Sequence, residues 1–209
     1  ERFQLPCGGQ LHVVIEPMLD NSNLLALLQM TERLKSRECI ERVLDVGSGK
    51  FEVKAVDRFR HLEFDGKFED FETTGKTLTQ TYGPRFQLFL IGAGNVSLYL
   101  AQMAQMLDYH VVVCDPREEM IEQWSVDGVQ LINDMPDDAV KAHANDPSTA
   151  IVALTHDPRI DDMGLMEALK TDAYFIGAMG STRTSAKRRE RLKLLELTEE
   201  EIDRLHGPV

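Results

Sequence analysis

The sequence has few cysteines, and none of the spacings that turn cysteines into structural bridges. Its 209 residues include only Cys7, Cys39 and Cys114, an odd number without a Cys-x-x-Cys pair. Such usage favours a reducing compartment over a disulfide framework or a zinc site. Long apolar runs are missing too: none reaches the roughly 18 residues that a membrane-spanning helix needs, and no basic-then-apolar leader is seen. We therefore expect a cytoplasmic protein that does not enter a membrane.

Positive charge is the second feature in short supply. The sequence has 23 lysines and arginines against 35 aspartates and glutamates, so its net charge is −12. Phosphate backbones need a net basic surface, which disfavours nucleic acid and anionic membranes as partners. Recognisable catalytic motifs are also missing, because there is no nucleophile elbow, no His-Glu-x-x-His and no tight carboxylate pair. The residues favour binding over catalysis.

A glycine motif between two apolar segments is the strongest local signal that is present. The apolar run over residues 86–91 ends in Gly92-x-Gly94, an amphipathic segment follows, and a β-branched run then ends at Asp115. In this strand–turn–helix order the amides at the helix start point at an anion. Asp115 lies about 20 residues after Gly94, the spacing expected of an acid that binds ribose. Ser97 stands where a third glycine usually sits. The segment predicts a mononucleotide-binding βαβ unit, with an ordinary tight turn as the alternative.

Beyond this unit, strand-like and helix-like runs keep alternating, which predicts a doubly wound parallel sheet. Ligands of such sheets lie outside the carboxyl ends of the strands. The expected strand ends carry Gly92-x-Gly94, Asp115 with Arg117, Thr155-His156-Asp157 and Gly177-x-x-Gly180-Ser181. We expect these motifs to converge on one crevice. The fold class is therefore α/β, with a Rossmann-like domain over residues 86–209 preceded by a smaller α+β domain over residues 1–83.

The N-terminal segment predicts several short strands and one helix. The expected elements are a strand over residues 12–15, a helix over residues 24–34 and strands over residues 40–46 and 51–56. Asp65-Gly66, between aromatic-flanked arms, predicts a tight hairpin. Cys7 precedes Gly8 and Gly9 just before the first strand. The glycines leave its thiol accessible to a ligand, or Cys7 is a small buried residue at a turn.

Three other motifs each allow two interpretations. His156 contacts a ligand, or it is a strand-end histidine whose partner is Asp157. Gly177-x-x-Gly180-Ser181 is a second anion-binding turn or a plain strand–helix loop. The basic run over residues 183–193 is a solvated helix face, or a patch that docks an anion or a partner.

Together these motifs resemble the XdhC/CoxI family, the accessory factors of xanthine dehydrogenase and related molybdenum hydroxylases. The matching segments are Cys7-Gly8-Gly9 through Glu16-Pro17, Ile91-Gly92-Ala93-Gly94, Val113 to Arg117, Thr155-His156-Asp157, Gly177 to Thr184 and Arg191 to Val209. They cover most of the chain, densely after residue 85 and thinly between residues 21 and 82. Asn95 and Ser97 stand where the family commonly has histidine and glycine.

The resemblance implies a small N-terminal domain, a Rossmann-like C-terminal domain and a non-catalytic, cytoplasmic chaperone. Such a chaperone binds the molybdenum cofactor (molybdopterin) while a cysteine desulfurase installs the terminal sulfur. It then hands the cofactor to apo-xanthine dehydrogenase or a related molybdenum hydroxylase, and a homodimer is one expected assembly. Cys7 would lie near the metal or the transferred sulfur. The expected cofactor-binding residues are Gly92, Gly94, Asn95, Asp115, Arg117, Thr155, His156, Asp157, Gly177, Gly180, Ser181, Cys7 and Gly8.

Two other functions stay open from the residues themselves. An NAD(P)-dependent oxidoreductase would use Gly92-x-Gly94 for the pyrophosphate, and Asp115 would favour NAD over NADP. It lacks an obvious acid or base for hydride transfer other than His156. The second alternative is an interaction module whose glycine turns hold no ligand and whose basic segment over residues 183–193 binds a partner.

Overall fold

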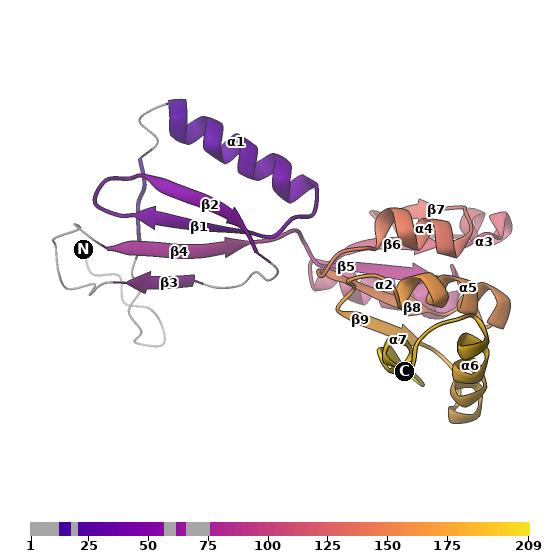
Figure 1. The fold of residues 1–209 in the computed structure, drawn as a ribbon. Coiled ribbons are helices and arrows are strands. Elements are labelled where there is room, and N and C mark those ends of the chain that lie inside the picture. The colour runs from indigo at the N-terminus through magenta and orange to yellow at the C-terminus, as the bar shows by residue number, and fades with distance from the viewer. Residues whose placement is uncertain (1–12, 18–20, 57–61, 66–75) are drawn as a thin grey trace, which may run out of the picture. The chain divides into compact units, whose positions relative to one another are not determined.

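The computed structural model describes residues 13–17, 21–56, 62–65 and 76–209. The chain divides into two compact units, Glu1–Pro84 and Arg85–Val209, and each unit has its own sheet (Figure 1). Cys7 and Gly8 lie outside the described residues, so the structure does not bear on their expected roles. Within the described part, no helix combines the length and the apolar character needed to cross a membrane.

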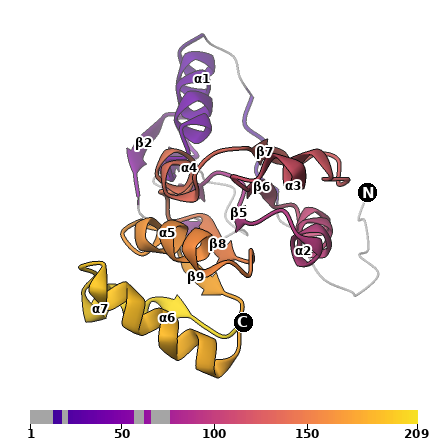
Figure 2. The same ribbon diagram turned by 90° about the vertical axis from the view of Figure 1, so that its right-hand side faces the viewer.

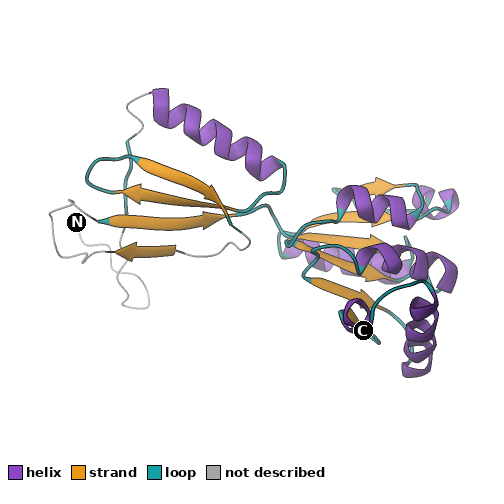
Figure 3. Cartoon of the chain, viewed as in Figure 1, coloured by secondary structure: helices purple, strands orange, loops and turns teal. Residues whose placement is uncertain are grey.

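The first unit is a helix packed on a four-stranded antiparallel sheet (Figure 3). Its elements are α1 (Asn21–Lys35), β1 (Ile40–Asp45), β2 (Phe51–Ala55), β3 (Leu62–Asp65) and β4 (Thr77–Tyr82), with the strands in the order β2-β1-β4-β3. Alternate residues of β1 are buried, and Ile40 and Leu44 form its apolar contribution to the core. Arg42, between them, pairs with Glu16 and lies over the ring of Phe51, 3.9 Å from its centroid.

Two local predictions in this unit are wrong. The strand expected over residues 12–15 is not formed in its described part, because residues 13–17 adopt no regular secondary structure. Asp65-Gly66 does not close a two-residue hairpin either. Asp65 pairs with Thr77, so the antiparallel strands β3 and β4 are joined by the longer segment between those two residues.

The second unit is a six-stranded parallel sheet covered by helices on both faces. Its elements are β5 (Gln87–Ile91), α2 (Asn95–Met106), β6 (His110–Cys114), α3 (Glu118–Glu122), β7 (Gln130–Ile132), α4 (Pro136–His143), β8 (Thr149–Ala153), α5 (Pro158–Ala168), β9 (Phe175–Ala178), α6 (Thr182–Leu194), α7 (Glu199–Asp203) and β10 (Leu205–His206). Figure 2 shows α2 and α3 on one side of the strands and α4 and α5 on the other. The α/β fold with its Rossmann-like parallel sheet is confirmed.

The central strands are buried on both faces, which explains why they read as continuous apolar runs. Phe89 and Ile91 of β5 point into one apolar layer, which includes Leu165 of α5. Leu88 and Leu90 point into the other, against the small residues of α2. In the sheet order β10-β9-β8-β5-β6-β7, strands β6 and β7 lie on one side of β5, and β8, β9 and β10 lie on the other. The helices that follow β5 and β8, α2 and α5, cover opposite faces of the sheet. Where the strand order reverses in this way, a crevice opens at the carboxyl ends of the strands.

Candidate functional site

A cavity of about 210 Å³ lies where the loops after β5, β6 and β8 meet. It is lined by Gly94, Asn95, Val96, Arg117, Met120, Leu154, Thr155 and His156. Five of the residues expected from the sequence line it together: Gly94, Asn95, Arg117, Thr155 and His156. Their convergence follows from the strand order, because the carboxyl ends of β5, β6 and β8 are neighbours in the sheet.

Gly92 lets the β5 and β8 ends approach each other. Its φ is +109°, which L side chains rarely adopt, and an added Cβ would lie 2.8 Å from Thr155 Cγ2 and 3.0 Å from the Thr155 backbone. Its amide donates to the Cys114 carbonyl at 2.7 Å. Ser97, in place of a third glycine, is fully buried and donates its hydroxyl to the Gly92 carbonyl at 2.5 Å. Gly92 is therefore required by packing and does not itself line the cavity.

Gly94 begins α2 and leaves the helix start open. It is the N-cap residue in an extended conformation, without a side-chain capping bond. An added Cβ would meet no atom within 4 Å. The first amides of α2 point along the helix axis, and a helix N-terminus favours negative charge. Gly94 thus leaves room for an anion in front of Asn95 and Val96.

Asp115 is committed to the protein rather than to a ligand. Its carboxylate is fully buried and accepts the Ala93 amide at 2.8 Å, the Arg117 amide at 3.0 Å, and Arg117 Nε and Nη2 at 2.8 and 2.7 Å. Two carboxylate oxygens offer about four acceptor sites, so these bonds fill them. Burial alone raises the pKa of Asp115, but the bonds from Arg117 and Ala93 outweigh it and hold that pKa below its usual range. Asp115 fixes the glycine turn and aims Arg117, which is 34% exposed, at the cavity.

We expect Asp115→Asn to lower the free energy of unfolding by about 2 kcal/mol near pH 7, because the amide cannot accept all four bonds. A carboxyl whose pKa is depressed by folding stabilises the folded state above its unfolded pKa of about 3.9 and loses that effect as pH falls. The difference in unfolding free energy between wild type and variant should therefore shrink below about pH 4. Denaturant titrations across pH measure it. Asp138→Asn, at an exposed carboxylate of α4, is the control; a difference that grew at low pH would contradict the assignment.

His156 is held over the cavity in a strained backbone conformation. Its φ is +63° and its side chain is exposed, and the left-handed region costs a non-glycine residue roughly 1–2 kcal/mol. Thr155 fixes the turn, because its hydroxyl donates to Asp161 Oδ1 at 2.7 Å and accepts the Asp157 amide at 3.0 Å. The turn keeps the imidazole at the cavity, where it can contact a ligand or exchange a proton.

Asp157 has a structural role. Its side chain caps α5 by accepting the Arg159 amide at 2.9 Å, and it pairs with Arg159 Nη2 at 2.8 Å. The hydrogen bond from the Arg159 side chain lowers the pKa of Asp157 to about 2. Asp157 does not line the cavity with its neighbours Thr155 and His156.

A buried ion cluster behind the His156 turn was not expected from the sequence. Arg188 of α6 is 2% exposed, and it donates to Asp161 Oδ2 at 2.9 Å, Asp162 Oδ1 at 3.1 Å and the Met179 carbonyl at 3.2 Å. Asp161 in turn accepts the amide and hydroxyl of Thr155. Arg188 thereby supports the cavity wall from α6. The sequence feature that could have indicated this cluster is the adjacent pair Asp161-Asp162, which follows the Asp157-Pro158 start of the helix.

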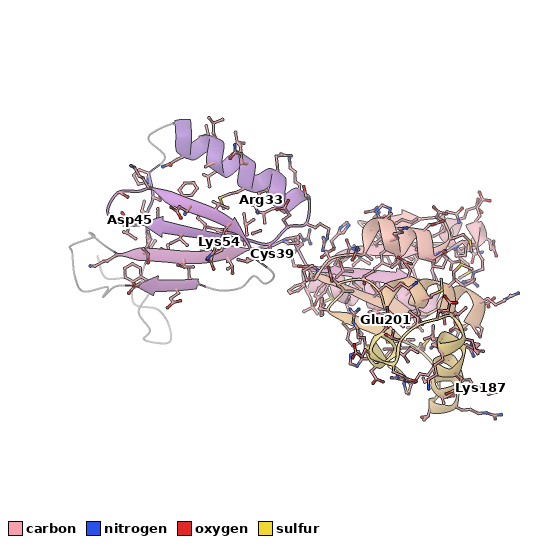
Figure 4. The ribbon with its side chains drawn as sticks, in the orientation of Figure 1. Arg33, Cys39, Asp45, Lys54, Lys187 and Glu201 are labelled. Carbon is pink, nitrogen blue, oxygen red and sulfur yellow. The ribbon has the colours of Figure 1, made fainter. Side chains whose placement is uncertain are left out.

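The basic run of α6 is neither a uniform solvated face nor a single patch. Arg188 is buried. Arg189 donates to the carbonyls of Ile202 and Leu205 at 3.0 and 2.8 Å. Arg191 pairs with Asp162. Lys187, by contrast, is exposed and extends away from α6 (Figure 4).

The Gly177-x-x-Gly180-Ser181 motif lies apart from the cavity. Gly177 is inside β9, one residue before its end, and not in a loop; an added Cβ would lie 2.8 Å from the ring of Phe175. Ser181 caps α6 by accepting the Thr184 amide at 3.1 Å, and Gly180 precedes it. None of Gly177, Gly180 and Ser181 lines the cavity. The loop is a packed strand–helix connection with a helix cap.

No cysteine side chain lines the cavity in the described part of the chain. Cys39 and Cys114 are buried and form no disulfide, and burial raises the pKa of Cys114 to about 12, so Cys114 stays protonated near neutral pH and is unreactive. Among the described residues, no three His, Cys, Asp or Glu side chains are grouped to hold a metal ion.

Comparisons with known proteins add a family and a fold. A family model described as the XdhC Rossmann domain matches residues 88–209. A solved structure described as a xanthine dehydrogenase from Bacillus halodurans is 21% identical, with a TM-score of 0.66, over 91% of this chain and 61% of that one. This chain therefore spans less than two thirds of that protein. At 21% sequence identity, the similarity shows a shared fold only.

Two other solved structures are more distant. A UDP-galactose 4-epimerase is 18% identical over 46% of this chain and 38% of its own, with a TM-score of 0.35. A scyllo-inositol dehydrogenase from Lactobacillus casei with bound NAD(H) is 11% identical over 53% of this chain and 33% of its own, with a TM-score of 0.39. No curated protein matches the chain.

Proposed function

The chain belongs to the XdhC family, and from that membership we propose that it binds the molybdenum cofactor, holds it for sulfuration and delivers it to a molybdenum hydroxylase. Xanthine dehydrogenase or a related enzyme would be the client, and a cysteine desulfurase would supply the sulfur. The observation that carries the proposal is the cavity at the carboxyl ends of β5, β6 and β8. There the open N-terminus of α2, the Arg117 guanidinium and the His156 imidazole meet.

The residues of the cavity fit the phosphate end of molybdopterin. Amides at the start of α2 can donate to phosphate oxygens, and Gly94 adds no side chain in front of them. Arg117 supplies a fixed cation, because Asp115 orients its guanidinium. The volume of about 210 Å³ is below the roughly 300–1,000 Å³ of sites that enclose a whole small ligand. The cavity suits a phosphate-bearing end better than the complete cofactor, as a temporary carrier requires.

When bound, the cofactor supplies the molybdenum centre whose ligand sphere is completed by sulfur. The chain's own residues would bind and orient it. Thr155 keeps the His156 turn in place. The His156 imidazole can donate a hydrogen bond to a ligand in the cavity. Asp115, the acid whose spacing suits a ribose, already accepts four bonds. This commitment of Asp115 weighs against NAD as the ligand, although the glycine turn lies where dinucleotides bind in such folds.

A thermal-shift comparison of the molybdenum cofactor, NAD and NADP on the reduced protein tests the proposal. At about 100 times its Kd a true ligand adds roughly 2.7 kcal/mol of stability. A shift with the molybdenum cofactor alone supports the assignment. A thermal shift with NAD or NADP alone, or no shift with the molybdenum cofactor, would rule out the proposed function.

Gly94→Asp should abolish that shift while the protein stays folded. The new carboxylate would stand at the open start of α2 and repel a phosphate, and an added Cβ there meets no atom within 4 Å. Gln102→Glu adds a similar charge at an exposed position of the same helix and should leave the shift unchanged. Equal losses in both variants would mean that general charge, and not the cavity, governs binding.

A further inference from the structure

The backbone donors of the glycine turn are used by the protein, whereas those at the start of α2 are not. The Gly92 amide donates to the carbonyl of the last residue of β6 at 2.7 Å, and the Ala93 amide donates to Asp115 Oδ2 at 2.8 Å. Asn95 and Val96 line the cavity, and their amides, the first two of the helix, have no acceptor in the described part of the chain. A ligand in the cavity therefore meets backbone donors at one point, the helix start, and not along the whole turn.

Arg117 adds donors that its pairing with Asp115 does not use. A guanidinium has five N–H groups, and Asp115 accepts one from Nε and one from Nη2, at 2.8 and 2.7 Å. Because the buried carboxylate balances the charge, Arg117 offers a ligand a fixed set of remaining N–H groups more than a free positive charge. Arg117 is 34% exposed and lines the cavity, so these donors lie beside the helix start.

The cavity has walls on both sides of the helix start. Arg117 and Met120 line it on the β6 side, and Thr155 and His156 line it on the β8 side. The methyl group of Thr155 packs onto Gly92, where an added Cβ would lie 2.8 Å from Thr155 Cγ2. In folds of this kind a dinucleotide crosses the point where the strand order reverses, with one nucleoside on each side. Here protein side chains occupy both of those sides.

We propose that the cavity takes one terminal phosphate monoester and discriminates against phosphates that link two groups. A terminal phosphate presents three free oxygens to the amides of α2 and the N–H groups of Arg117. A phosphodiester or a pyrophosphate has fewer free oxygens on each phosphorus and a second substituent, which the walls at Met120 and Thr155 exclude. The inference rests on the proposed function, since it concerns the same cavity, and it names the chemical class of ligand that the cavity selects.

Three small probes with the same phenyl ring separate charge from the number of free oxygens. Phenyl phosphate is a dianion at about pH 8, because the second pKa of a phosphate monoester is about 6. Methyl phenyl phosphate is a singly charged diester with two free oxygens, and phenyl sulfate is singly charged with three. Ligand-observed proton NMR on the full chain measures all three. We expect phenyl phosphate to bind at least about tenfold more tightly than the diester, and phenyl sulfate to bind more tightly than the diester at equal charge.

A matched pair of arginine variants locates the binding. Arg117→Lys should weaken phenyl phosphate several-fold and reduce its advantage over the diester, because an ammonium group lacks the planar fork of N–H donors. Arg159→Lys is the control. Arg159 also pairs with an aspartate two residues before it, but it is 89% exposed and does not line the cavity. It should bind all three probes like wild type, and circular dichroism checks that both variants are folded.

The inference and the proposed function fail separately. Equal binding of phenyl phosphate and methyl phenyl phosphate, or no binding of phenyl phosphate up to millimolar concentration, would overturn the inference even if the molybdenum cofactor gives its thermal shift. Equal losses in Arg117→Lys and Arg159→Lys would overturn it too. Selective binding of phenyl phosphate that Arg117→Lys weakens, without a thermal shift from the molybdenum cofactor, would support the monoester site and remove the proposed function.

Discussion

Replacing Arg188 by methionine is expected to lower the free energy of unfolding by about 3–5 kcal/mol, the cost of removing one partner from a buried ion cluster. Arg188 is 2% exposed and contacts both Asp161 and Asp162. Methionine fills similar space without charge, so the loss comes mainly from two carboxylates that stay buried without their common partner. Urea denaturation monitored by circular dichroism measures it.

The pH dependence of this loss has a defined sign. Burial raises the pKa of Asp161, and Arg188 is among the groups that oppose the rise. Without Arg188 that pKa should rise further. A carboxyl whose folded pKa lies above its unfolded value makes the folded state more stable as pH falls through the folded pKa. The deficit of Arg188→Met should therefore shrink as the pH is lowered from neutral.

The neighbouring residue supplies a matched control. Lys187→Met removes a positive charge one position earlier on α6, but Lys187 is exposed, so we expect a change within about 0.5 kcal/mol. If Arg188→Met were as stable as Lys187→Met, the cluster would not support the fold. A loss of cavity ligand in Arg188→Met at temperatures where it remains folded would show that the cluster also holds the Thr155 and His156 turn.

The sheet and the cavity were predictable from local sequence because their signals are local. β5 and β8 are apolar on both faces, so each reads as an uninterrupted run that stops at a polar or glycine-rich turn. Parallel strands place their carboxyl ends at one edge, which is why Gly94, Arg117 and His156 were expected together and are found together.

The role of charged residues was harder to predict because their partners are distant in sequence. Arg188 lies 26 residues after Asp162 and 27 after Asp161. In the sequence it looked like one member of a basic helix. Asp115 was expected to bind a ligand from its spacing alone, but that spacing equally places it beside the Ala93 amide. Spacing fixes where an acid lies, and only the tertiary contacts decide what it binds.

Strand boundaries were missed for a similar reason. Gly177 was expected in the turn or loop after a strand, but β9 continues through it to Ala178, and Gly177 pairs with Val152 of β8 and His206 of β10. Glycine normally signals the end of a strand. Here its missing side chain makes room for the ring of Phe175.

Gly92→Ala is expected to destabilise the second unit by about 3 kcal/mol or more, and it separates the two glycines of the turn. At φ +109° a side chain is strained, and the added Cβ would press on the Thr155 backbone at 3.0 Å. Backbone strain of this kind costs about 1–3 kcal/mol, and overpacking costs a further 1–3 kcal/mol. Thr155 belongs to the wall of the cavity, so ligand binding should be lost together with stability.

Gly94→Ala should behave differently, although only Ala93 separates the two glycines. Its φ is −86° and an added Cβ meets nothing within 4 Å, so we expect a loss of no more than about 1 kcal/mol from the poorer cap. Thermal melts of both variants with and without ligand provide the comparison. Equal stability of the two variants would mean that β5 and β8 can separate to admit a methyl group. The cavity would then be adjustable rather than fixed by Gly92.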